Sequence, residues 1–132
     1  MALLSLQAMA KIERFEDLDC WKQSRRLVNM LYDISEQGAL AKDFSTRDQL
    51  RRAALSAMNN IAEGFGRYSN KEFVRFLEIS QASAIEVRSM LYILLDRHYI
   101  TTVQFDTLLP EIISLTNQVN GLITYLKTRT KT

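Results

Sequence analysis

Four long segments of the chain repeat apolar residues at alternating steps of three and four. This spacing places apolar side chains along one stripe of an α-helix, and such a stripe is buried against a neighbouring helix. The pattern predicts helices over residues 16–37, 45–67, 69–97 and 101–128, joined by short connections. Consecutive amphipathic helices with short connections pack as antiparallel neighbours. We therefore expect an all-α fold, an antiparallel up-down-up-down four-helix bundle.

Local signals mark where the predicted helices begin and end. Gly38 is expected to stop the first helix, and Leu40 and Phe44 to tuck under the end of the bundle. Pro110 removes one backbone hydrogen bond from the fourth helix and is expected to bend or divide it near Leu108. The expected N-cap pairs are Ser45 with Asp48, Ser69 with Glu72, and Thr101 with Gln104.

Composition narrows the chemistry that the chain can carry. Apolar residues make up 47% of the 132 positions, and the low content of Gly and Pro favours long helices over strands. The single cysteine, Cys20, excludes an intramolecular disulfide and fits a reducing cytoplasm. The single histidine, His98, leaves little for metal binding and is expected to lie at a helix end. We expect a cytoplasmic protein with no metal, cofactor or membrane segment.

One domain is expected to account for nearly the whole chain. The bundle is predicted to fill residues 15–128, and residues 129–132 to form a frayed tail. Residues 1–14 are interpreted as a flexible N-terminal extension, in which Met9 is an alternative start. This extension lacks the basic start and long apolar stretch of a signal peptide, so no targeting segment is predicted.

The second predicted helix carries more apolar surface than one bundle core needs. A line of mostly small residues is flanked, about 100° away around the helix, by a second apolar row. One interpretation is a well-buried helix, and the other is a subunit interface. The core line is Leu50, Ala54, Ala57, Ile61 and Gly64, and the interface candidates in the second row are Leu55, Met58 and Phe65.

A polar row follows another face of the same helix. Asn and Glu beside apolar rows need partners if they are buried, and serines on the antiparallel third helix could supply them. Three interpretations stay open: a solvated face, a structural polar network that fixes register, and a catalytic site using Glu63 with Asn60 or His98. The network candidates are Ser56, Asn60, Glu63, Ser80 and Ser83.

Basic residues gather at the start of the second predicted helix and around the turn that follows it. The chain has 17 basic and 15 acidic side chains, a formal net charge of +2, which is too weak to indicate nucleic acid by itself. Repeated in an oligomer, such groups could hold a phosphate backbone; the alternative is an ordinary solvated surface. The candidates are Arg47, Arg51, Arg52, Arg67 and Lys71.

Several segments taken together resemble one known family. They are Phe15 to Leu18 (F-E-D-L) with Trp21-Lys22, Gln49 to Ala54 (Q-L-R-R-A-A), Asn60 to Gly64 (N-I-A-E-G), and Ser69 to Leu77 (S-N-K-E-F-V-R-F-L). Over residues 15–126 this combination is similar to the bacterial four-helix-bundle proteins first noticed as open reading frames in intervening sequences of the large-subunit ribosomal RNA gene. In the third helix, Gln81-Ala82-Ser83 replaces a stretch that is often richer in glycine.

The resemblance implies an up-down-up-down bundle that assembles into a ring-shaped homopentamer without enzymatic activity. It also implies similarity to the accessory protein of diversity-generating retroelements, a basic pentamer that binds nucleic acid and a reverse transcriptase. This chain departs from that protein in being only weakly basic. Our leading hypothesis is a homo-oligomeric binding module for RNA or a ribonucleoprotein. The alternative is a protein-protein scaffold or adaptor that binds no nucleic acid.

Overall fold

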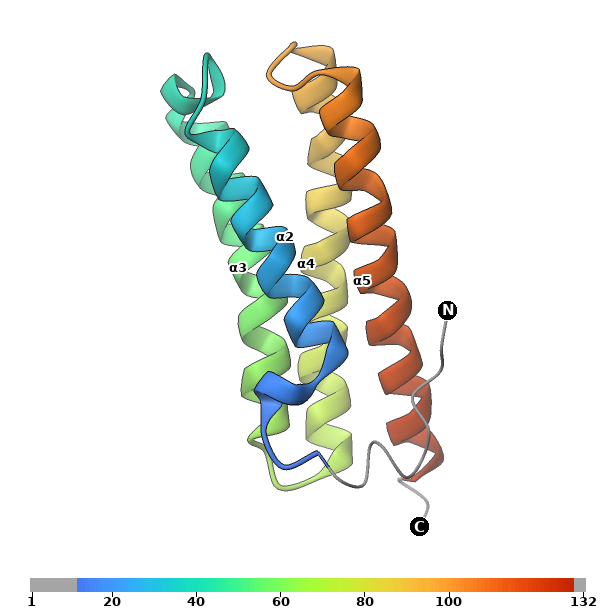
Figure 1. The fold of residues 1–132 in the computed structure, drawn as a ribbon. Helices are drawn as coiled ribbons and strands as arrows, with labels where there is room; N and C mark the ends of the chain where they lie inside the picture. The colour runs from blue at the N-terminus through green and yellow to red at the C-terminus, as the bar shows by residue number, and fades with distance from the viewer. Residues whose placement is uncertain (1–11, 130–132) are drawn as a thin grey trace.

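The computed structural model describes residues 12–129, and this part of the chain is helical and contains no strand (Figure 1). Predictions for residues 1–11 and 130–132, including Met9 as an alternative start, lie outside the described residues. The elements are η1 (Phe15–Asp17), α2 (Asp19–Ser35), η2 (Leu40–Lys42), α3 (Phe44–Phe65), α4 (Asn70–Asp96) and α5 (Thr102–Thr128).

The four long helices form one bundle, which confirms the predicted fold class. Successive helices run in opposite directions, as the colour gradient in Figure 1 shows. Each helix packs against two others, in the cyclic order α2, α3, α4, α5 and back to α2. The α2–α3 connection (residues 36–43) and the α4–α5 turn lie at one end of the bundle, and the α3–α4 turn (residues 66–69) lies at the other.

The apolar stripes of the four helices meet in a single core. Large aliphatic side chains from every helix are completely buried there, among them Leu27, Leu50, Leu91 and Ile112. Burying such a side chain stabilises the fold by about 1.5–3 kcal/mol, so these stripes are the main reason that the helices form. Cys20 lies in the same core, and burial raises the pKa of its thiol to about 12. The thiol therefore stays protonated at neutral pH.

Small residues let α3 approach α4 closely, as the apolar pattern predicted. Ala54, Ala57 and Gly64 are buried along this side of α3. A Cβ atom placed on Gly64 would lie 2.7 Å from the Cβ of Phe76 and 2.9 Å from Cδ1 of Phe73. The glycine is therefore needed for contact between the end of α3 and the beginning of α4.

The N-caps agree with the sequence prediction at two helices and differ at the third. Thr101 and Gln104 form a complete capping box on α5. Ser69 accepts the Glu72 backbone N–H at 3.1 Å, although the Glu72 carboxylate pairs with Arg75 instead of closing the box. The prediction for α3 was wrong, because Asp43 caps that helix in place of Ser45.

Two further expectations fail in part, for physical reasons. Leu40 is buried under the end of the bundle, but Phe44 is 63% exposed because α3 begins at this residue, two positions earlier than an N-cap at Ser45 would place it. Pro110 does not divide α5, which is continuous from Thr102 to Thr128. Proline removes a single backbone hydrogen bond, whereas buried Leu108 and Ile112 hold the helix to the core on either side of it.

Candidate functional site

The five basic residues proposed from the sequence separate into two groups in the fold. Arg47, Arg51 and Arg52 lie in the first part of α3, whereas Arg67 and Lys71 flank the α3–α4 turn. The 22 residues of α3 span about 33 Å at about 1.5 Å per residue. One chain therefore does not bring the five side chains together into a single basic surface.

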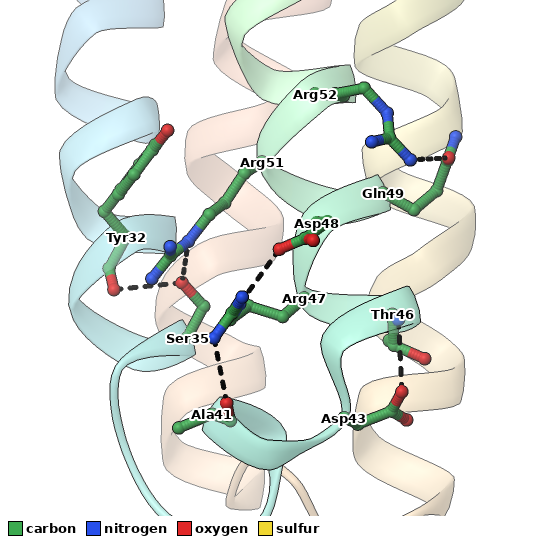
Figure 2. A network of polar contacts seen from close by, with 10 residues as sticks. All are labelled: Tyr32, Ser35, Ala41, Asp43, Thr46, Arg47, Asp48, Gln49, Arg51 and Arg52. Carbon is green, nitrogen blue, oxygen red and sulfur yellow. Dashed lines mark hydrogen bonds and ion pairs between the residues drawn. The ribbon is translucent and has the colours of Figure 1, made fainter.

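Arg51 is built into the interface between α2 and α3 (Figure 2). Its Nε donates to Oγ of Ser35 at 2.8 Å, and its guanidinium carbon lies 4.4 Å from the centroid of the Tyr32 ring. Ser35 is fully buried and donates its own hydroxyl to the Tyr32 carbonyl at 3.0 Å. Arg51 thus satisfies a buried hydroxyl and covers an aromatic ring.

Arg47 is also occupied by the fold, whereas Arg52 is exposed (Figure 2). One nitrogen of Arg47 donates to the Ala41 carbonyl at 3.0 Å, and its Nε pairs with Asp48 at 3.0 Å. Its guanidinium also lies over the ring of Phe44, at 4.8 Å. Among residues 12–129, Arg52 donates only to the side chain of Gln49, at 3.1 Å. Of these three arginines, Arg52 alone remains open to a ligand.

A tie between two connections holds this end of the bundle, and the sequence analysis missed it. Asp43 accepts the Thr46 backbone N–H at 3.1 Å and the Tyr99 hydroxyl at 2.8 Å. The hydroxyl of Tyr99 is the main reason that the pKa of Asp43 lies below its usual value, and the same bond raises the pKa of Tyr99. No local signal pairs residues 56 positions apart, so only the packed bundle reveals this contact.

The α3–α4 turn presents its basic side chains differently. Arg67 and Arg75 stack on one ring, with each guanidinium carbon 4.6 Å from the centroid of Phe76. Tyr68 is fully exposed between the two helices. Lys71 is exposed and forms no hydrogen bond or ion pair with another described residue. We name this group the turn cluster: Arg67, Tyr68, Lys71, Arg75 and Phe76.

Two carboxylates accompany the arginines of the turn cluster. Glu63 accepts from Arg67 at 2.6 Å, and Glu72 accepts from Arg75 at 3.2 Å. The bond from Arg75 lowers the pKa of Glu72. The sequence prediction had included Arg67 and Lys71 but neither Tyr68 nor Phe76, although an aromatic residue directly after Arg67 was the available signal.

The predicted polar network forms in part. The hydroxyls of Ser56 and Ser83 are 2.8 Å apart and join α3 to α4, and the Asn60 amide donates to the Ser56 carbonyl at 2.8 Å. Ser80 crosses separately to the Ala57 carbonyl at 2.6 Å. Glu63 does not take part in this network, because its exposed carboxylate pairs with Arg67, one helical turn further along. The Ser56–Ser83 and Ser80–Ala57 bonds fix the register of α3 against α4, whereas the Asn60 bond lies within α3.

The pairing of Glu63 with His98 considered in the sequence analysis does not exist in the fold. Glu63 lies beside the α3–α4 turn, whereas His98 lies in the α4–α5 turn, with the 27 residues of α4 between them. The Asn60 amide is directed at Ser56. Within residues 12–129, His, Cys, Asp and Glu side chains form no group of three that could hold a metal ion.

The proposed interface residues Leu55, Met58 and Phe65 are half-buried and pack partly on the core. Leu55 follows Arg51 by one helical turn, and Arg51 contacts Tyr32, so these side chains share the outer side of α3 and α2. We name this surface the α2–α3 face: Trp21, Tyr32, Leu55, Met58 and Phe65.

More exposed apolar side chains lie on α4, where the sequence analysis had expected only a core stripe. Ile85 and Ile93 are 54% and 53% exposed, and Ile79 and Tyr92 are exposed to a lesser degree. Tyr92 stands edge-on to Phe105 of α5, at 5.2 Å between ring centroids. We name this surface the α4 face: Ile79, Ile85, Tyr92 and Ile93.

These observations define a class of protein before any comparison is made. The chain is a small four-helix bundle whose distinctive features are two apolar faces and a basic, aromatic turn. None of the helices in the described part is long and apolar enough to cross a membrane.

Comparisons with known proteins agree with this class. The chain belongs to the 23S rRNA-intervening sequence protein family, whose model matches residues 16–121. A similar solved structure is that of a protein of unknown function from the S23 ribosomal protein family of Bacteroides thetaiotaomicron. The TM-score is 0.72 at 22% identity, over 80% of this chain and 95% of that one, so the likeness concerns the fold. No protein of curated function matches the chain.

Proposed function

We propose that this chain is a cytoplasmic, non-enzymatic binding module that acts as a homo-oligomer and takes RNA or a ribonucleoprotein as its ligand. The family resemblance implies a ring of five copies. The observation that carries the proposal is the pair of apolar surfaces, the α2–α3 face and the α4 face, on different sides of one bundle. The α2–α3 face is half-buried and the α4 face is exposed, and a domain of 15.3 kDa rarely presents two such apolar surfaces unless something covers them.

Two different faces favour a ring over a symmetric dimer. A two-fold dimer joins a patch to the same patch on its partner, whereas a closed ring joins one patch to a different patch on the next copy. The α2–α3 face is rich in aromatic side chains, and arginines lie over Trp21 and Tyr32. The α4 face is mainly aliphatic, with three isoleucines. Aromatic and arginine side chains against aliphatic ones suit the centre of an interface.

Light scattering during size-exclusion chromatography tests the assembly. We expect the wild type to have about five times the mass of the 15.3 kDa chain. Met58→Glu and Ile93→Glu should each reduce the mass, because a charge would then be buried in one of the two faces. Val103→Glu is the matched control, since Val103 is 75% exposed on α5, outside both faces. A monomeric wild type at micromolar concentration would contradict the proposal.

Mixing the two variants separates a ring from other assemblies. Each variant keeps one intact face, so the intact α4 face of Met58→Glu can still bind the intact α2–α3 face of Ile93→Glu. The mixture should therefore stop at a heterodimer of about twice the chain mass, while each variant alone stays monomeric. Circular dichroism checks that both variants stay helical. Loss of helix in Met58→Glu would place Met58 in the core instead.

A protein-protein scaffold that binds no nucleic acid is the second candidate. Within the α4 face, Ile85 and Tyr92 lie one heptad apart on the flank towards α5, so a ring contact centred on Ile93 leaves them free to bind a second protein. Affinity purification from the native host tests it. Recovery of the chain alone would count against a scaffold, whereas loss of a co-purifying protein in Tyr92→Ala would support it.

A further inference from the structure

We propose that the turn cluster is a binding site for single-stranded RNA, in which Tyr68 stacks on a base and Arg67, Lys71 and Arg75 contact the phosphates. This inference deepens the proposed function by naming the surface and the form of nucleic acid. The five residues come from the end of α3, the turn and the first two turns of α4.

Tyr68 is the residue that points to a base. Its ring is fully exposed and forms no aromatic contact with another described residue. A phenol ring presented at a tight turn, with a basic side chain on either side, is an open stacking platform. Stacking of one unpaired base on such a ring typically strengthens binding by about tenfold, whichever base it is.

Stacking on Phe76 orients the two arginines before any ligand arrives. Both guanidinium groups lie 4.6 Å from the Phe76 centroid, and each is also held on one side by a glutamate. An arginine held in this way loses little side-chain entropy when it contacts a phosphate. Lys71, which has no ion pair with a described residue, adds a mobile positive charge one turn from Arg75.

The net charge of the turn cluster and its two glutamates is positive but small, so RNA binding by one copy is expected to be weak. Three basic side chains against Glu63 and Glu72 leave a net charge of +1 at the turn. The N-terminal end of α4 adds partial positive charge at this turn and the C-terminal end of α3 adds partial negative charge, so the helix dipoles leave this small net charge nearly unchanged. One copy is therefore expected to bind weakly.

Cyclic assembly would compensate for weak single sites. Rotation about the ring axis places every copy of the turn cluster at the same height and the same distance from that axis. A flexible single strand could then contact several clusters in succession, and the effective concentration of each further site would raise the overall affinity. Duplex RNA would bind less well, because its bases are already stacked and paired and are not available to Tyr68.

The opposite end of the bundle supplies matched controls. Phe44 is an exposed aromatic residue and Lys42 an exposed lysine, and both lie beside the α2–α3 connection. The probe is an unstructured, fluorescein-labelled RNA of about 15 nucleotides, in the range of single-strand site sizes. Fluorescence anisotropy at low salt compares the wild type with Tyr68→Ala, Lys71→Gln, Phe44→Ala and Lys42→Gln.

We expect Tyr68→Ala to weaken binding by about tenfold and Lys71→Gln by a few fold, with no change in the two controls. A duplex of the same length should bind the wild type more weakly than the single strand. No binding by the wild type, equal loss in the controls, or an effect of Lys71→Gln without one of Tyr68→Ala would overturn the proposal. Equal binding of the duplex would also overturn it.

Light scattering on the same samples distinguishes this inference from the proposed function. If the protein is a monomer that binds the single strand through Tyr68, the binding site is supported and the proposed oligomer is wrong. If the protein is an oligomer that binds no RNA, the assembly is supported and the binding site is wrong. Since Tyr68 is fully exposed, unchanged thermal unfolding of Tyr68→Ala should exclude a folding defect as the cause.

Discussion

The two ends of this bundle use arginine in opposite ways. Beside the α2–α3 connection, Arg51 gives its hydrogen bond to buried Ser35 and its flat face to Tyr32. At the α3–α4 turn, Arg67 pairs with an exposed glutamate and lies on a ring at the surface. The residue type is the same; Arg51 lies in α3, and Arg67 directly follows the C-cap of that helix. The difference is that Arg51 lies within hydrogen-bonding distance of a buried acceptor, the Ser35 hydroxyl, whereas the partner of Arg67 is exposed.

The connections themselves explain this difference. The α2–α3 connection is long enough to fold back under the bundle. The Ala41 carbonyl in this connection and the Ser35 hydroxyl at the end of α2 then need donors, which Arg47 and Arg51 supply. The α3–α4 turn is short and is completed by the Ser69 side-chain cap of α4, by backbone bonds to the Gly64 carbonyl and by the close packing at Gly64. Its side chains therefore remain outside the fold, where they are available to a ligand.

The largest effect is expected at Gly64. In Gly64→Ala the new Cβ would lie 2.7 Å from the Cβ of Phe76, which is fixed to the α4 backbone, so the two helices must separate. We expect the free energy of unfolding to fall by about 1–3 kcal/mol in urea titrations. Gly66→Ala is the control, because its nearest atom would be 3.6 Å away. Equal stability of the two variants would contradict the close packing at this end.

An intermediate effect on stability is expected when one arginine is removed from each end of the bundle. Arg51→Ala leaves the buried Ser35 hydroxyl without its donor and uncovers Tyr32, so the free energy of unfolding should fall by about 2 kcal/mol. Arg67→Ala removes an exposed ion pair and a surface stack and should cost less than about 1 kcal/mol. Urea unfolding measures both variants. A larger loss for Arg67→Ala would reverse our assignment of the structural and the exposed arginine.

The smallest effect concerns acid sensitivity. The pKa values of Asp43 and Glu72 are both lowered in the folded state, by the Tyr99 hydroxyl and by Arg75 respectively. A lowered carboxyl pKa contributes stability that is present above the unfolded value of about 4 and is lost as pH falls below it. Asp43→Asn and Glu72→Gln should therefore each flatten the fall in stability between about pH 5 and pH 3.

The contributions of these two carboxylates to stability should differ in their dependence on salt. The bond from Tyr99 to Asp43 has a neutral donor, so its contribution should persist at high ionic strength, whereas the exposed pair of Glu72 with Arg75 should be screened. Urea titrations across this pH range, with and without about 1 M NaCl, test the difference. Tyr99→Phe should reproduce part of the effect of Asp43→Asn, because the bonds from Thr46 still lower the pKa of Asp43. An unchanged acid profile in Tyr99→Phe would show that this tie contributes nothing in solution.

Much of the bundle could be read from local patterns, and the errors share one cause. The Thr101–Gln104 capping box depends on residues three apart, and the structure confirms it. At α3, both Asp43 and Ser45 are suitable N-caps by residue type. In the structure Asp43 is the N-cap, and the hydroxyl of Tyr99, from the α4–α5 turn, donates a hydrogen bond that holds its carboxylate. A local rule cannot rank two caps when a distant residue stabilises one of them.

The candidate site shows the same division. The basic candidates were found by type, but their grouping depends on the length of α3, which keeps Arg51 and Arg67 at opposite ends. Tyr68 and Phe76 join the turn cluster only when α4 folds back along α3. The α4 face was missed because the stripe of α4 was assigned wholly to the core, and exposure of Ile93 is known only after the other three helices are placed.

The sequence by itself determined that this chain forms four amphipathic helices, because the spacing of apolar residues and most of the caps act within one or two helical turns. It also determined the family, through several different short segments distributed along the chain. Only the tertiary structure decided which arginines are structural, which apolar side chains stay exposed and which residues form the turn cluster. Those properties depend on contacts between residues far apart in the sequence, and such contacts exist only once the four stripes are buried together.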